Sequence, residues 1–210
     1  MLSSVGWAAL GVGFIFLMTS LGAASVLFCR EDASIKSQTG MMGFAGGVMT
    51  AATVWSMLLP AIEQTRSEGT LPCWLPAAAG TAAGAAFLCA LDALILRLRR
   101  GGSTEKSSML MTAITLHNIP EGMAVGLAFA LSGGADGLTA AAALALGIGV
   151  QNVPEGAAVS LPLRRMGMSR GRAFSMGVLS GAVEPLFGML AVMAVSGISR
   201  IMPWLLGFSA

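Results

Sequence analysis

The chain has 210 residues, of which 55% are hydrophobic and only 10% are charged, and its mean hydropathy is +0.79. A soluble domain carries roughly 25% charged residues, so this composition excludes a soluble globular protein. The formal net charge is only +2, and no basic stretch is interleaved with aromatic residues, so no nucleic-acid partner is expected.

Charge-poor segments follow one another along the chain, and each long one exceeds the roughly 20 apolar residues that a membrane-spanning helix needs. The N-terminal segment lacks the basic start of a signal peptide and is too long for one, so we interpret it as a true span. A last segment, Ile201–Ala210, is too short to span a bilayer at about 1.5 Å per residue. The long segments are Val5–Cys29, Thr39–Ile62, Leu71–Leu96, Met109–Ser132, Leu138–Leu163 and Ala173–Ser196.

These segments predict an all-α fold, a polytopic transmembrane helix bundle with six complete spans and the start of a seventh. No long polar linker divides the chain, so we expect residues 1–210 to form a single transmembrane domain in contact with the lipid bilayer. Ten of the twelve Lys and Arg residues lie in the first, third and fifth connecting loops, at 30–36, 97–106 and 164–172. Because basic residues concentrate in cytoplasmic loops, this pattern predicts an N-terminus on the outside.

A six-residue motif occurs twice near the centre of the chain. Residues 117–122 have the sequence HNIPEG, and residues 151–156, one span and one loop later, have the sequence QNVPEG. The two copies are therefore expected on antiparallel helices, as inverted repeats of the kind that place transporter sites near the bilayer midplane. Gly122 and Gly156 end the two copies and are expected to let these two helices approach each other closely.

The polar side chains of each copy share one helix face, because positions i, i+1 and i+4 lie at about 0°, 100° and 40° around a helix. A third acidic residue lies mid-span in the sixth segment, and a methionine midway along the second is a soft candidate ligand. An ionisable residue at the bilayer centre costs about 2.5–3.5 kcal/mol, so these carboxylates require a compensating cation or proton. The candidate metal-binding residues are His117, Asn118, Glu121, Gln151, Asn152, Glu155, Glu184 and Met49.

Carboxylate oxygens with one imidazole suit Zn²⁺, Fe²⁺, Mn²⁺ or Cd²⁺ better than Cu⁺, because this residue set contains no thiolate. The cation is expected as a transported substrate, and the chain has no nucleotide motif that would indicate an organic cofactor. An enzyme is not expected, since the sequence contains no HExxH motif. Two alternatives stay open at this stage: an intramembrane metal-dependent hydrolase, and a non-transporting assembly subunit.

With this doubled motif the chain resembles the ZIP (Zrt/Irt-like) family of divalent metal transporters, and within it the prokaryotic GufA-type branch. The HNIPEG and QNVPEG motifs look like that branch's fourth and fifth helices, and Gly43–Glu63 looks like its second. The resemblance covers essentially the whole chain. It implies transport of zinc or a related cation toward the cytoplasm, in a bacterial inner membrane, and leaves a homodimer open.

The resemblance also implies a binuclear metal site at the centre of an eight-span family fold, with Glu121 bridging the two ions. Gln151 stands where many relatives outside this branch have histidine, and Met49 corresponds to a ligand on the second helix. Since the chain ends as a seventh span begins, we expect it to be truncated relative to the family. The two ligand sets that the resemblance implies are His117, Glu121 and Glu155, and Asn118, Asn152 and Glu184.

Overall fold

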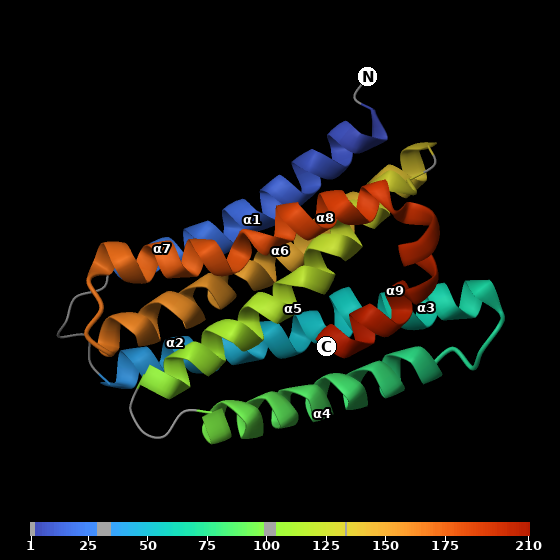
Figure 1. The fold of residues 1–210 in the computed structure, drawn as a ribbon. Coiled ribbons are helices and arrows are strands. Elements are labelled where there is room, and N and C mark those ends of the chain that lie inside the picture. Colours follow the sequence, from blue (N-terminus) through green and yellow to red (C-terminus); the bar gives the residue numbers. More distant parts are fainter. Residues whose placement is uncertain (1–2, 29–34, 99–103, 133) are drawn as a thin grey trace.

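The computed structural model describes residues 3–28, 35–98, 104–132 and 134–210, and within these ranges every secondary-structure element is a helix. The predicted all-α class is therefore confirmed. Cys29, Arg30, Arg99 and Arg100, on which parts of the span and orientation predictions depend, lie outside the described residues. The elements are α1 (Ser4–Phe28), α2 (Ile35–Ala52), the π-helix η1 (Thr53–Leu58), α3 (Leu59–Glu68), α4 (Leu75–Leu98), α5 (Thr104–Ala130), α6 (Gly134–Arg165), α7 (Arg170–Gly181), α8 (Val183–Met193) and α9 (Val195–Ser209) (Figure 1).

Three helical stretches of the described chain are long and apolar enough to cross a membrane: α1, α6 and the run from Arg170 to Met193 that contains α7 and α8. The second, third and fourth predicted segments are also helical, in α2–α3, α4 and α5, but among the described residues they do not meet the same criteria. The count of six spans therefore stays a prediction.

Two of the predicted spans are interrupted next to a proline. The second span passes through the π-helical turn η1 directly before Pro60, and the sixth breaks at Ala182, between α7 and α8, just before Pro185. Proline has no N–H to donate to the carbonyl four residues back, so each of these points lacks one bond of the regular helical ladder. Helix α9 likewise begins at Val195, six residues before the predicted seventh segment, because the chain turns at Ala194.

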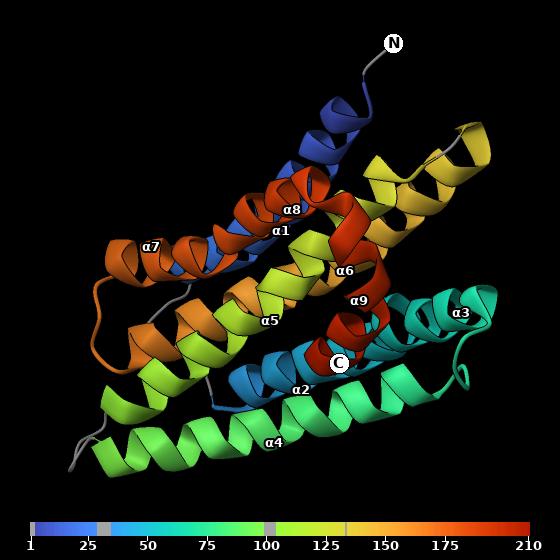
Figure 2. The ribbon, with the colours of Figure 1, turned by 45° about the vertical axis from the view of Figure 1, so that its right-hand side comes forward.

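The helices run back and forth between two ends of the molecule, and α6 folds back antiparallel along α5 (Figures 1 and 2). Helices α1, α4 and α6 finish at the end where α2, α5 and α7 begin, on the left of Figure 1. Helix α1 packs against α6 and α7, while α9 turns away after α8 and lies against α4. This arrangement surrounds α5 and α6, which carry the doubled motif, with helices on several sides.

Glycines set the closest helix contacts, but the two motif glycines do not join α5 to α6 as predicted. A Cβ atom built on Gly122 would lie 2.6 Å from the Cα atom of Glu184 in α8. A Cβ atom on Gly156 would lie 2.7 Å from the backbone nitrogen of Ala23 in α1 and would collide with the Thr19 carbonyl. Because glycine has no side chain, α8 packs closely against α5, and α1 packs closely against α6. Two further helices therefore line the region of the motif.

The polar motif residues lie between two apolar clusters of the core. One cluster includes Val12 and Ile15 of α1 with Ile148 of α6, and the other includes Val26 of α1 with Leu163 of α6. Residues 117–121 and 151–155 lie between these levels along α5 and α6. Apolar residues of α1, α5 and α6 therefore pack on both sides of the polar centre along these helices.

Candidate metal centre

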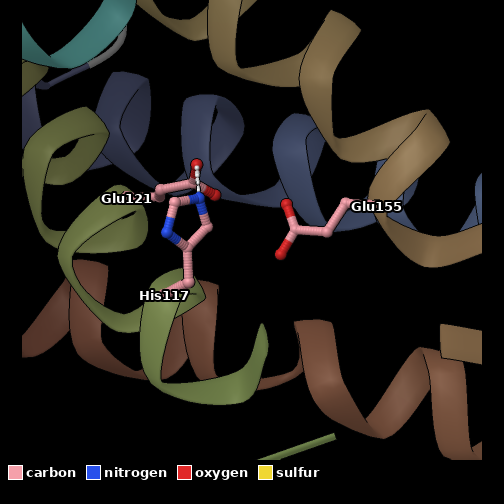
Figure 3. A group of neighbouring side chains, drawn as sticks. All are labelled: His117, Glu121 and Glu155. Atoms are coloured by element: carbon pink, nitrogen blue, oxygen red, sulfur yellow. Dashed lines mark ion pairs between the residues drawn. The ribbon is translucent and has the colours of Figure 1, made fainter. Parts of the chain in front are cut away.

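One titratable cluster in the described chain has the composition of a metal site. It joins His117 and Glu121 on α5 to Glu155 on α6, with one ligand atom from each lying within 4.8 Å of the other two. Figure 3 shows the Glu155 carboxylate pointing across the gap between the helices toward the other two side chains. Bonds from Zn²⁺ to nitrogen or oxygen are about 2.0–2.2 Å long, so these three donors enclose a space of the right size for one cation.

The carboxylates of the centre are completely buried. Glu121, Glu155 and Glu184 each have 0% exposure, whereas the His117 side chain is 20% exposed. Within the described residues no Lys or Arg pairs with any of them, and the recorded ion pair is from His117 Nε2 to Glu121 Oε1 at 3.2 Å. A buried charge normally has a partner of opposite charge or a metal, so these acidic residues are suited to bind a cation.

Gln151 occupies the space between the first two ligands. Its Nε2 atom donates a hydrogen bond to Glu121 Oε1 and lies 3.1 Å from His117 Nε2. The amide nitrogen thus stands where a cation would contact the same two atoms. Its own Oε1 is buried without a donor, and rotation of the amide would turn this oxygen toward a bound ion.

The two asparagines of the motif are oriented by backbone carbonyls of other helices. Asn118 Nδ2 donates to the Ser180 carbonyl at 3.0 Å, and Asn152 Nδ2 donates to the Ile15 carbonyl at 3.3 Å. A carbonyl oxygen only accepts hydrogen bonds, so the nitrogen of each amide must face it. The Oδ1 atom of each residue is left buried without a donor.

These residues leave a set of buried acceptor oxygens with no hydrogen-bond donor in the described structure. Buried polar atoms nearly always have a partner, and an acceptor without a donor can be satisfied by a cation. The amides of Gln151 and Asn152 lie beside the carboxylates of Glu155 and Glu184, but not in full hydrogen-bonding geometry. The unpartnered oxygens are Asn118 Oδ1, Glu121 Oε2, Gln151 Oε1, Asn152 Oδ1, both oxygens of Glu155, and Glu184 Oε2.

Glu184 joins the centre through the break between α7 and α8. It lies in the first turn of α8, where the positive end of the helix dipole favours a carboxylate, and it interacts electrostatically with Glu121 and Glu155. The same break brings the Ser180 carbonyl to Asn118. Seven of the eight residues singled out from the sequence therefore come together.

Met49 is the exception. It is half-buried on α2, and no contact in the described structure links it to the cluster. Conversely, Thr19 on α1, whose hydroxyl lies 2.6 Å from Glu184 Oε1, was not among the residues identified from the sequence. A single threonine in an apolar span usually bonds its own helix. Its presence at position 19 therefore does not by itself indicate a functional role.

Comparison with known proteins agrees with this chemistry. The family described as ZIP Zinc transporter matches residues 95–210, which include every residue of the centre except Thr19. The chain is 39% identical to the zinc transporter GufA of Myxococcus xanthus, over 91% of this chain and 77% of that protein. It is 36% identical to the zinc transporter ZIPB of Bordetella bronchiseptica, over 98% and 68% respectively, and 33% identical to the human zinc transporter ZIP11, over 99% and 86%.

Proposed function

This chain belongs to the ZIP family of transporters, and from that membership we propose that it carries a divalent metal ion across a membrane through the buried centre between α5 and α6. The observation that carries this proposal is the combination of three fully buried carboxylates with buried acceptor oxygens that lack donors. The relatives named above are zinc transporters, so Zn²⁺ is the first candidate, followed by Fe²⁺, Mn²⁺ and Cd²⁺.

The proposed site holds two ions. His117, Glu121 and Glu155 would bind the first, in agreement with their mutual distances. The second would use the buried oxygens of Asn118, Asn152 and Glu184 that lack a donor, with Glu121 shared between the two ions. Six spans would surround this site, with the N-terminus outside a bacterial inner membrane and net movement toward the cytoplasm.

Flux into liposomes tests this function directly. Protein reconstituted with an encapsulated metal-sensitive dye should admit Zn²⁺ in a saturable manner, and Glu121→Gln should lower the initial rate by on the order of 100-fold, because it removes a charged ligand shared by both ions. The same variant should bind less Zn²⁺ per protein in detergent. Glu68→Gln, the same change at an exposed position on α3, is the matched control and should retain both flux and binding.

Undiminished Zn²⁺ binding by Glu121→Gln would contradict the proposed site. Normal binding without flux in the unmodified chain would instead contradict transport, and would favour a non-transporting subunit.

A further inference from the structure

Helix α1 carries no charged residue, yet it reaches the metal centre through one side chain. Thr19 is completely buried, and its Oγ1 lies 2.6 Å from Glu184 Oε1, 165 positions away in the chain. In this hydrogen bond the threonine hydroxyl donates and the Glu184 carboxyl oxygen accepts. The distance is that of a charge-assisted hydrogen bond.

The bond that Thr19 makes within its own helix is correspondingly weak. Its Oγ1 lies 3.3 Å from the Ile15 carbonyl, the usual acceptor four residues back. In five other threonines, Oγ1 lies 2.7–2.9 Å from the carbonyl oxygen four residues back. For Thr65 this distance is 2.8 Å. A hydroxyl has one proton, so Thr19 directs its proton to Glu184, whereas Thr65 directs its proton to its own helix.

Two glycines fix the position of Thr19. A Cβ atom built on Gly181 would lie 2.8 Å from Thr19 Cγ2 and 3.0 Å from Thr19 Cβ, and one on Gly156 would collide with the Thr19 carbonyl. The side chain of Thr19 therefore packs against the end of α7, and its backbone packs against α6. Its hydroxyl has little freedom to turn away from Glu184.

We propose that Thr19 is a positioning residue for the second cation subsite: by donating to Glu184 Oε1 it presents Glu184 Oε2 to the ion. Glu184 Oε2 is buried and has no donor, as this role requires. The inference deepens the proposed function and rests on it, and it assigns Thr19 no bond to the metal. Removing a group that orients a ligand typically lowers metal affinity about 10–100-fold.

The test compares Thr19→Val with Thr19→Ser by calorimetric titration of Zn²⁺ in detergent. Valine keeps the shape but removes the hydroxyl, so the second binding event should weaken about 10–100-fold while the first is retained. Serine keeps the hydroxyl and should stay within about threefold of the unmodified protein. Thr65→Val makes the same change at a buried threonine that bonds only its own helix, and should leave both binding events unchanged.

Two results would overturn the inference: an unchanged second binding event in Thr19→Val, or equal losses in Thr19→Val and Thr19→Ser, which would indicate packing alone. If Thr19→Val does not fold, Thr19→Ala takes its place with the same expectation. In a Glu184→Gln background, Thr19→Val should have no further effect on metal affinity. Retention of both binding events by Glu121→Gln would reject the metal site itself, which is a separate outcome from rejection of the Thr19 role.

Discussion

At the scale of single residues, Gln151 offers a test of metal preference. Its amide bridges His117 and Glu121, so a ligand of another type at this position would act directly on the first ion. Imidazole suits Zn²⁺, whereas carboxylate and carbonyl oxygens suit Mn²⁺. Gln151→His should therefore raise the affinity for Zn²⁺ relative to Mn²⁺ by roughly tenfold, measured by competition in detergent.

The control for this change is Gln151→Leu, which removes the amide without adding a ligand and should weaken Zn²⁺ and Mn²⁺ alike. An unaltered Zn²⁺ to Mn²⁺ ratio in Gln151→His would show that position 151 does not contact the ion.

Residue chemistry explains why most of the centre was predictable from the sequence. A carboxylate such as Glu121 or Glu155 inside an apolar helix is costly, so its presence alone indicates a function. Thr19 carries no such cost, because its hydroxyl can always bond the preceding turn of its own helix. Its role depends on a partner 165 positions away, and no local pattern encodes that pairing.

At the scale of helices, the contact between α5 and α8 places Glu184 beside the first ligands. Gly122 permits that contact, since an added Cβ atom would lie 2.6 Å from Glu184 Cα. Gly122→Ala should therefore separate the two helices, cost about 1–3 kcal/mol of stability through overpacking, and weaken the second metal-binding event. Thermal unfolding and Zn²⁺ titration in detergent measure the two effects.

Gly13→Ala is the matched control, because it makes the same change inside a helix where nothing lies within 4 Å of the added atom. If Gly122→Ala unfolds at the same temperature as Gly13→Ala and binds Zn²⁺ normally, the α5–α8 contact is not a determinant of the site.

Helix positions were more predictable than helix partners. Long apolar runs located α1 and α6 to within a few residues, because span length follows from bilayer thickness. The motif glycines showed that close contacts would occur, but not which helices would make them: Gly156 meets α1, and Gly122 meets α8. The break at Ala182 was also missed, since proline within a membrane helix often only bends it, as the unbroken α5 around Pro120 illustrates.

At the scale of the whole molecule, the polar centre is flanked along α1, α5 and α6 by apolar packing, while the His117 side chain keeps 20% exposure. The cluster around Ile15 and Ile148 lies on one side of it, and the cluster around Val26 and Leu163 lies on the other. A hydrated ion could move through either cluster only if these packed side chains moved apart.

Because the helices alternate between the two ends of the molecule, the orientation of the chain in the membrane can be tested. Ser67 lies at the exposed end of α3, and Met166, which is 41% exposed, lies in the turn after α6 at the opposite end (Figure 1). Because the basic residues concentrate around the second of these ends, it should face the cytoplasm. After replacement of the native cysteines, an impermeant thiol reagent should label Ser67→Cys in intact cells, and Met166→Cys only after the membrane is permeabilised.

Each other labelling pattern has a distinct meaning for the proposed site. Labelling of Met166→Cys alone in intact cells would invert the orientation while leaving α5 and α6 antiparallel, so the metal centre would stand and the direction of transport would need revision. Labelling of both positions from the same side would mean that an even number of spans separates them. In that case α4, α5 and α6 could not all cross the membrane, and the two PEG motifs would lose the midplane location on which transport through the centre depends.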